Sequence, residues 1–354
     1  MPNPVVGLAV GGGTGPELAE VFERVLQRLG EAHGVGFDIV RSPRVYDSYV
    51  SLRSLGIGEI RRRTQEDAEH YEQFCRALAG RGVAAVFRTA INAQSLYLVR
   101  QRLRAVKVDV LTHQSASLLL VRDEAQGFYT GENQHTPGAV TRTMEFSREI
   151  TEEIIAFALE RARRQWPDGG PGEVLMAYKF HLLDGALDEW VTALSRRLGV
   201  AIRLCQPDTV NRNLVEHGLG ERTLLIAGNE WADIMHVVLL DRFGGERQEN
   251  RCTENVHLHP DVAGLVEYQT VHGSADDLAG RGAVNPVATI RAAAAIAEHH
   301  GGCAGAVRQV ERAIDALRRR GVGTPDLGGR HTTTGVADAL LAAVDPLATP
   351  VAGW

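Results

Sequence analysis

The sequence predicts an α/β protein, because short apolar runs rich in Val, Ile and Leu alternate along the chain with longer stretches that are apolar at helical spacing. The first pair is VVGLAV at 5–10, followed by a glycine-rich turn and then by the amphipathic stretch ELAEVFERVLQRLGEA. No segment repeats at a fixed period, which excludes a solenoid. We therefore expect one compact body in which helices cover the strands.

The same pattern predicts the remaining elements. Further buried strands are expected at 83–87, 106–112, 174–178 and 223–228, and helices at 147–165, 184–198, 286–299 and 304–320. WPDGGPG at 166–172 predicts a turn, since glycine and proline both interrupt regular structure. The arginine triplets at 61–63 and 318–320 are expected on solvated helix faces.

Composition excludes several classes of protein. With 44% hydrophobic and 23% charged residues, the chain has the profile of a soluble globular protein. A net charge of −6 without a dense basic stripe argues against nucleic acid, and the apolar runs are too short to span a membrane. The N-terminus is typical of a first strand and not of a signal peptide, so we expect a cytoplasmic protein. The four cysteines lack CxxC spacing, which argues against a zinc site and against disulfides.

Lysine is almost absent, since only Lys107 and Lys179 occur among 38 basic residues. Arginine stays protonated at any working pH, whereas a lysine in a suitable environment can lose its proton and act as a base. Lys179 is therefore a candidate for chemistry. The count alone also fits a surface lysine, so its surroundings decide between the two interpretations.

Two glycine-containing clusters are candidates for ligand binding. GGGTGPE at 11–17 follows a strand and opens a helix, which fits either a tight turn or a loop whose amides bind an anion. VHGSADDLAGRGAVNP at 271–286 runs directly into a helix and has the composition of a pocket for adenine and ribose. Asp277 there could accept from ribose hydroxyls and would repel a 2′-phosphate, which favours NAD over NADP.

These motifs resemble those of a known family, the isocitrate and 3-isopropylmalate dehydrogenases, which are β-hydroxyacid oxidative decarboxylases. GGGTGPE resembles the family's GDGIGPE, HGSADDLAGRGAVNP resembles HGSAPDIAGKGIANP, and GTPDLGGRHTTTGVADAL at 323–340 resembles its closing TPDLGG segment. The resemblance implies a two-domain fold with a mixed central sheet and a nucleotide site unlike a Rossmann domain. It implies a large domain of 1–103 with 254–354, a small domain of 104–253, and a homodimer or higher homo-oligomer that shares its active site across the interface.

The resemblance also implies the residues of the site. VRDEAQGFYTG at 121–131 resembles the family's RENTEGxYxG stretch, QPDTVNRNLV contains Asp208, and NEWADIMH places Asp233 on a metal aspartate. The implied catalytic residues are Tyr129, Lys179 and Asp208, the last two lent by the partner subunit; the substrate-binding residues are Arg104, Arg122, Gln94 and His181; the cofactor-binding residues are His272, Gly273, Ser274, Ala275, Asp277, Leu278 and Asn285; and the ligands of Mg²⁺ or Mn²⁺ are Asp208 and Asp233. Apart from any family, a lysine base, a tyrosine acid, metal carboxylates and guanidinium groups form a coherent chemical set.

Four departures from the family pattern fall where substrate and metal are expected. Val237 replaces the second metal aspartate, Gln94 falls at the first substrate arginine, His181 replaces an asparagine, and Gln269 replaces an acidic residue. The segment 244–261 also lacks the family pattern.

Other residues could compensate for these departures. His236 could replace the lost metal ligand, although a polar surface neighbour is the expected reading of this residue. Arg88, Arg100 or Arg102 could replace the lost cation, although a solvated helix face is expected for the last two.

The departures argue against isocitrate, isopropylmalate or homoisocitrate as the substrate. We expect NAD-dependent oxidation, with decarboxylation, of a malate-like 2-hydroxy acid in a specialised biosynthetic pathway. One alternative is a catalytically silent or regulatory family member, motivated by Val237 and Gln94. Another is a dehydrogenase that oxidises without decarboxylation or acts on an acid with a single carboxylate.

Overall fold

The computed structural model describes residues 2–243 and 247–344, so part of the atypical segment 244–261, namely 244–246, lies outside the described residues. The chain divides into two compact units. Unit 1 comprises 1–96, 248–253 and 264–354, and unit 2 comprises 97–247 and 254–263. This division assigns 97–103 and 254–263 to unit 2, whereas the sequence-based domains placed them in the large domain.

Unit 1 contains a parallel sheet. Its strands are β1 (Val5–Gly11), β2 (Asp38–Tyr46), β3 (Ala85–Arg88) and β12 (Val266–Thr270), in the order β2-β1-β3-β12. Its helices are α1 (Gly15–His33), α2 (Tyr49–Arg53), α3 (Ile57–Gly80), α9 (Val287–Gly301), α10 (Ala306–Arg319) and α11 (Thr333–Ala343), with short 3₁₀ turns at Gln248–Asn250, Asp276–Leu278 and Pro325–Leu327. Helix α4 (Ala93–Arg102) begins in unit 1 and continues into unit 2.

Both faces of the unit 1 sheet are covered, which explains why its inner strands β1 and β3 are almost continuously apolar. One face packs against α1, α9, α10 and α11 around side chains such as Val6, Leu8 and Phe87. On the other face α3 approaches β1 closely, because Gly7 has no side chain. A Cβ at Gly7 would lie 2.3 Å from Cδ1 of Leu78.

Unit 2 contains a mixed sheet. Its strands are β11 (Cys252–His257), which begins in the last residues of unit 1, β4 (Ala105–His113), β5 (Ala116–Asp123), β10 (Arg222–Gly228), β8 (Glu173–Ala177) and β9 (Arg203–Cys205), in that order. Strand β4 is antiparallel to β11 and β5, whereas β5, β10, β8 and β9 are parallel. Its helices are α5 (Arg148–Gln165), α6 (Ala186–Leu198), α7 (Pro207–His217) and α8 (Asn229–Arg242), with 3₁₀ turns at Phe180–Leu183 and Pro260–Val262.

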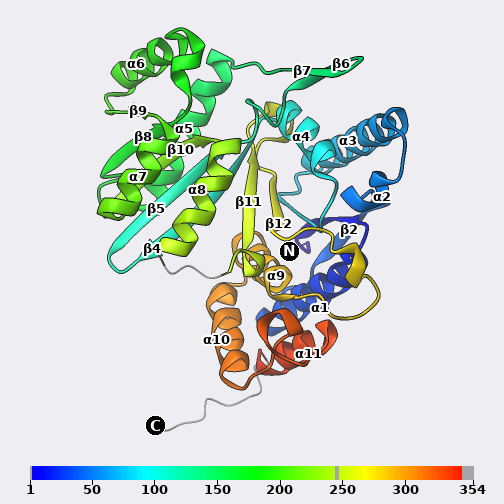
Figure 1. The fold of residues 1–354 in the computed structure, drawn as a ribbon. Helices are drawn as coiled ribbons and strands as arrows, with labels where there is room; N and C mark the ends of the chain where they lie inside the picture. The colour runs from blue at the N-terminus through cyan, green and yellow to red at the C-terminus, as the bar shows by residue number, and fades with distance from the viewer. Residues whose placement is uncertain (1, 244–246, 345–354) are drawn as a thin grey trace. The chain divides into compact units, whose positions relative to one another are not determined.

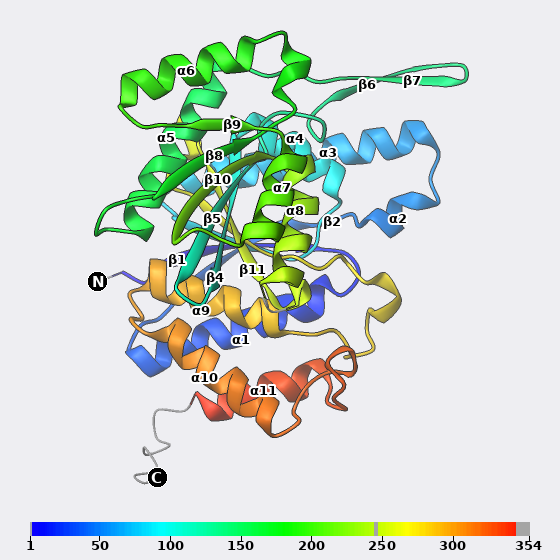
Figure 2. The ribbon, with the colours of Figure 1, turned by 60° about the vertical axis from the view of Figure 1, so that its left-hand side comes forward.

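Alternate residues of these strands pack on opposite faces of the sheet, as the two-residue period of a strand requires. Val121 and Ile226 belong to the core with α5 and α6, whereas Leu120 and Leu225 belong to the core with α7 and α8. A separate hairpin, β6 (Glu132–Thr136) with β7 (Ala139–Thr143), extends from unit 2 as an exposed two-stranded arm (Figure 1, Figure 2).

The predicted α/β class and mixed sheet are confirmed. Each strand and helix predicted from periodicity is present with small shifts at its ends, and 166–172 is a connecting loop. Periodicity did not identify α3, β5, α7, α8 or the β6–β7 hairpin. None of the helices in the described part of the chain is long and apolar enough to cross a membrane.

Candidate active site

The predicted catalytic residues of unit 2 follow the ends of its parallel strands, and such strands bring their carboxyl ends to one edge of a sheet. Strand β5 leads into the loop 123–131, which carries Tyr129, and β8 leads through Tyr178 to Lys179. Strand β9 leads into α7 with Asp208, and β10 leads into α8 with Asp233. The topology therefore gathers four functional groups, from four segments of the chain, at one edge.

Lys179 and Asp208 form an ion pair at this edge, with Nζ 2.7 Å from Oδ1. This hydrogen bond from Lys179 lowers the pKa of the Asp208 carboxyl. Nζ also lies 5.7 Å from the centre of the Trp231 ring, close enough for a cation–π contact. The side chain of Gln206 donates to Nδ1 of His181 at 2.6 Å. Lys179 and His181 therefore both contact the segment that begins α7.

Asp233 is the centre of a second cluster. The hydroxyl of Tyr129 donates to Oδ2 of Asp233 at 3.0 Å, and the guanidinium of Arg122 forms an ion pair with Oδ1. Arg122 also donates to Oδ1 of Asn229 from Nε at 3.1 Å and from Nη2 at 2.7 Å. The Tyr129 ring stacks on Tyr97 with 4.7 Å between ring centres. The tyrosine, the arginine and the predicted metal aspartate are thus in direct contact.

A buried carboxyl links the two clusters. Oδ2 of Asp123 accepts from the hydroxyl of Tyr178 at 2.9 Å and from Gln126 at 3.0 Å, and Oδ1 accepts from the backbone N–H groups of Ala125 and Gln126. Burial raises the pKa of Asp123 to about 7. Asp123 begins the loop that carries Tyr129, and Tyr178 directly precedes Lys179. The carboxyl therefore fixes both segments against each other.

Two predicted substrate residues lie apart from these clusters. Arg104 pairs with Glu149 at 2.8 Å and with Glu153 at 2.6 Å, both on α5. Because Arg122 contacts α8, the two guanidinium groups point to opposite faces of the sheet. Gln94 is exposed in the first turn of α4, in the part of this helix that belongs to unit 1.

Two expectations about polar residues are wrong. Arg100 is not on a solvated face, since it is 6% exposed and lies 3.0 Å from Oε2 of Glu124. His236 is not a surface neighbour, since it is 1% exposed and lies 3.9 Å from Oδ1 of Asp109. In both cases the partner carboxylate comes from a distant segment, since Glu124 directly follows β5 and Asp109 lies in β4. Burial turns His236 away from solvent, so it does not replace the missing metal ligand.

The chain offers few ligands for a divalent cation. Within 2–243 and 247–344, no group of three or more His, Cys, Asp and Glu side chains is placed to hold a metal ion. Val237 is exposed on α8 and has no ligand atom. Asp208 and Asp233 remain, and Mg²⁺ is commonly held by one or two carboxylates together with water and substrate oxygens. These two carboxylates supply the kind of oxygen ligand that such a cation takes.

In unit 1 the loop that contains the predicted cofactor residues is attached to the glycine-rich turn. The backbone N–H and the hydroxyl of Thr14 both donate to the carbonyl of Ser274, at 2.9 and 3.0 Å. The hydroxyl of Ser48 donates to Oδ1 of Asp276 at 2.6 Å. A Cβ at Gly13, where φ is +63°, would lie 2.3 Å from the carbonyl oxygen of Ser274. The GGGTGPE turn thus needs glycine to approach this loop.

The predicted cofactor residues differ in how free their polar groups are. Nδ1 of His272 lies 3.0 Å from the carbonyl of Gly273, and Nε2 is buried without a partner in the described part of the chain. Burial lowers the pKa of His272. Asp277 is exposed, Ala275 has a positive φ of 43°, and Leu278 ends the adjoining 3₁₀ turn.

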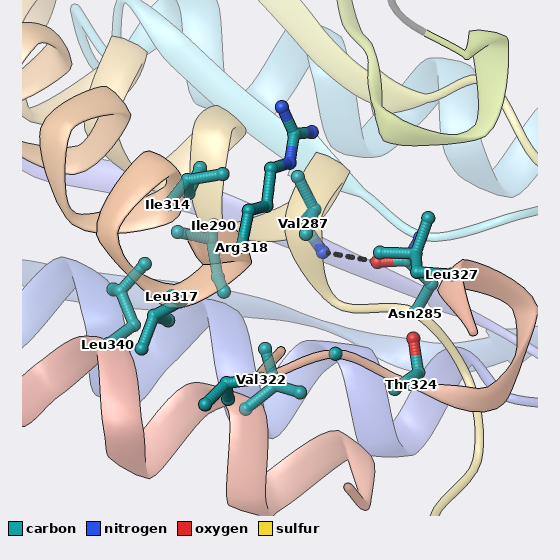
Figure 3. A pocket seen from close by; sticks show the side chains of 12 residues that line it. Asn285, Val287, Ile290, Ile314, Leu317, Arg318, Val322, Thr324, Leu327 and Leu340 are labelled. Carbon is teal, nitrogen blue, oxygen red and sulfur yellow. Dashed lines mark hydrogen bonds between the residues drawn. The ribbon is translucent and has the colours of Figure 1, made fainter. Parts of the chain in front are cut away.

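Asn285 is used inside the protein. Its Nδ2 donates to Asn250 at 2.7 Å and to Asp326 at 2.9 Å, and its Oδ1 accepts from the backbone of Val287 (Figure 3). Behind it lies an apolar cavity of about 20 Å³ between α9, α10 and α11. A cavity of this size holds about one water molecule, so it is a gap in packing and not an adenine pocket.

Sequence analysis missed three residues of the unit 2 site: Tyr97, Asp123 and Glu230. Tyr97 stacks on Tyr129, and Asp123 links the two clusters. Glu230 lies in the first turn of α8, directly after a buried strand. The available signal was an acidic residue at the start of a helix, which the helix dipole favours.

Comparison with known proteins supports the sequence interpretation. Residues 255–340 match the family model described as isocitrate/isopropylmalate dehydrogenase. The chain is 41% identical over 90 residues to 3-isopropylmalate dehydrogenase A of Aspergillus niger, covering 25% of each protein. It is 28% identical over 239 residues to 3-isopropylmalate dehydrogenase of Oceanobacillus iheyensis, covering 64% of this chain and 61% of that enzyme. The matched segments thus span less than two thirds of the length of either relative.

The fold is similar to that of a solved dehydrogenase. Isocitrate dehydrogenase from Methylococcus capsulatus superposes with a TM-score of 0.68 at 20% identity, covering 96% of this chain and 99% of that chain. The fold therefore defines an α/β protein of the isopropylmalate-dehydrogenase-like class. Residues 255–340 thus carry the sequence pattern of the isocitrate/isopropylmalate dehydrogenase family, and the chain as a whole is similar to these enzymes in fold.

Proposed function

We propose that the protein is an NAD-dependent dehydrogenase that oxidises, and decarboxylates, a malate-like 2-hydroxy acid in a specialised biosynthetic pathway. The observation that carries the proposal is the pair of proton-handling contacts in unit 2. Lys179 is bonded to Asp208, and Tyr129 is bonded to Asp233. Oxidation of the hydroxyl requires a base, and protonation of the carbon that loses CO₂ requires an acid. One lysine pair and one tyrosine pair match these two needs.

The chain's own residues would divide the work as follows. Nζ of Lys179 first passes its own proton to Asp208, with which it is bonded, and then takes the proton from the substrate hydroxyl. Arg122 binds a substrate carboxylate, which is the bidentate partner a guanidinium prefers. The hydroxyl of Tyr129 donates a proton to the carbon from which CO₂ has left. NAD would supply the hydride acceptor, and a divalent cation held by Asp208 and Asp233 would supply Lewis acidity.

The departures from the family pattern support an unusual substrate. The side chain of Gln94 is neutral and exposed, so this position lacks the guanidinium that its relatives would use for a carboxylate. Arg104 is already paired with two glutamates. A substrate with fewer or differently spaced carboxylates than isocitrate would need fewer free cations.

We also propose a homodimer. Neighbouring helices α7 and α8 carry exposed apolar side chains at Val215, Ile234 and Val237. Apolar side chains that gather on one surface are typical of protein interfaces. Ile234→Glu should therefore shift the molar mass measured by light scattering from dimer toward monomer.

The direct test is NADH formation from a panel of 3-substituted malates with NAD and Mn²⁺, with CO₂ measured in parallel. Lys179→Met should reduce turnover by about 100-fold or more, because it removes the base. A matched control is Arg203→Met, which removes another cation that pairs with a carboxylate of unit 2 at 3.0 Å. A wild-type protein that turns over no acid, but associates tightly with an active relative, would show the silent subunit instead. NADH without CO₂ would remove the decarboxylation.

A further inference from the structure

The loop that carries Tyr129 rests on a carboxylate that neither the proposed mechanism nor the predicted site includes. The loop bends at Gly127, where φ is +100°, and a Cβ there would lie 3.1 Å from Oε2 and 3.4 Å from Oε1 of Glu230. The backbone of Phe128 offsets part of the rise that burial causes in the pKa of the Glu230 carboxyl. Glu230 therefore lies directly against the turn that precedes Tyr129.

The same helix holds the other end of the tyrosine. Asp233 lies three residues after Glu230, hence on the same face of α8, and accepts from the Tyr129 hydroxyl at 3.0 Å. The Tyr97 ring lies parallel to the Tyr129 ring within 9°. Arg142 of β7 donates to the carbonyl oxygens of Phe128 at 2.6 Å and of Tyr129 at 2.8 Å. Backbone, ring and hydroxyl are each fixed by a separate contact.

The position of Glu230 is costly for folding. Burial raises the pKa of its carboxyl, and Oε2 is buried without a hydrogen-bond partner among the described residues. A buried acceptor left unpaired destabilises a protein, and an apolar side chain at this position would avoid that cost. The contact with the Tyr129 loop offers a reason for a carboxylate here.

We propose that Glu230 is a positioning residue for Tyr129: its carboxylate fixes the Phe128 peptide and so keeps the phenol aligned with Asp233. This inference rests on the proposed function, in which Tyr129 donates the proton after CO₂ leaves. Because hydride transfer depends on Lys179, loss of Glu230 should impair the later proton transfer and leave hydride transfer nearly unchanged.

The variants Glu230→Gln and Glu230→Ala separate positioning from charge. Glutamine keeps one oxygen that can accept from Phe128, whereas alanine keeps none. We expect Glu230→Ala to lower kcat about 10- to 100-fold, as misplacement of a catalytic group does, with KM for the acid changed less than about threefold. Glu230→Gln should stay within about threefold of the wild type. Glu216→Ala, on an exposed part of α7, is the control for loss of an acidic charge.

Two readouts distinguish positioning from a general structural effect. In a single turnover, Glu230→Ala should form NADH at the wild-type rate but release the finished product slowly. Crystal structures should show residues 127–129 displaced from Tyr97 in Glu230→Ala and unmoved in Glu230→Gln. Gly127→Ala disturbs the same contact from the loop side and replaces Glu230→Ala if that variant does not fold.

Each possible result either supports or overturns the proposed role of Glu230. Wild-type kcat in Glu230→Ala, or an unmoved loop in its structure, overturns the proposal. Equal losses in Glu230→Gln and Glu230→Ala would assign the effect to the charge and also overturn positioning. If the wild-type protein is inactive on all acids, the proposed function is refuted. The role of Glu230 is still tested in that case, because displacement of residues 127–129 in the crystal structure is measured without turnover.

Discussion

Replacing Arg88 by Met should lower the free energy of unfolding of unit 1 by about 3–5 kcal/mol, because it breaks a buried ion pair and removes the guanidinium that neutralises a buried carboxylate. Arg88 ends β3, and its Nε lies 2.7 Å from Oε1 of Glu267 on β12. The side chains are 4% and 2% exposed, so water cannot replace the lost partner. Tyr71 still donates to Oε2 at 2.6 Å, but one neutral hydroxyl does not compensate a buried charge.

The chain offers a matched control for this substitution. Arg62 on α3 also pairs with two carboxylates, those of Glu59 and Glu66, but its side chain is 55% exposed. Exposed ion pairs contribute about 0–1 kcal/mol, so Arg62→Met should change stability by no more than that. The double variant Arg88→Met with Glu267→Gln should recover part of the loss, because the buried negative charge that lost its guanidinium is then gone.

Urea unfolding followed by far-UV circular dichroism measures these differences at a fixed protein concentration. Tryptophan fluorescence is less suitable, because the tryptophans in the described part of the chain, Trp166, Trp190 and Trp231, all lie in unit 2. A loss below about 1 kcal/mol in Arg88→Met, equal to that of Arg62→Met, would refute the reasoning that burial determines the strength of this pair.

Three further substitutions test the site. In Lys179→Arg the new guanidinium can keep the ion pair with Asp208 but cannot give up its proton. The variant should therefore retain the wild-type melting temperature and lose about 100-fold or more of the NADH-forming activity. Near-normal activity would exclude Lys179 as the base. Asp277→Lys should weaken binding of NAD and allow binding of NADP, as measured by a fluorescence titration. An unchanged preference for NAD over NADP would show that the 271–286 loop does not contact the ribose. The pKa of Asp123 is about 7 in the folded protein and about 3.9 in an unfolded chain, so its contribution to stability is fully present below about pH 4 and is lost as pH rises through 7. Asp123→Asn should therefore flatten the fall in melting temperature between pH 4 and 7, and identical slopes would contradict the burial argument.

The sequence predicted the fold well where a local pattern determined it. Strands such as 223–228 are recognisable because both faces of a parallel strand are buried, so nearly every residue is apolar. The motif around Tyr129 and the lysine at 179 were also recognisable from sequence alone. The structure places both after strand ends, at the same edge of the sheet.

Contacts between distant segments could not be predicted in this way. Arg100 resembles a surface arginine until β5 brings Glu124 to it, and His236 resembles a polar surface residue until β4 brings Asp109 close. Arg104 matches its motif, yet its direction is set by two glutamates of α5 some 45 residues away. Glu230 went unnoticed because its carboxylate lies against the backbone of the turn at Gly127, and no sequence pattern reveals such a contact.

The scarcity of lysine has a practical consequence for chemical labelling. Lys107 is 8% exposed inside unit 2, whereas the side chain of Lys179 is 29% exposed. Acylating reagents react with free amines and not with guanidinium groups, which remain protonated. Most proteins present many amines to such a reagent, but here Lys179 is the accessible lysine. Apart from the α-amino group, an activated ester would therefore label this chain mainly at Lys179, and protection by an acid bound at the proposed catalytic edge could be read as the loss of that one added mass.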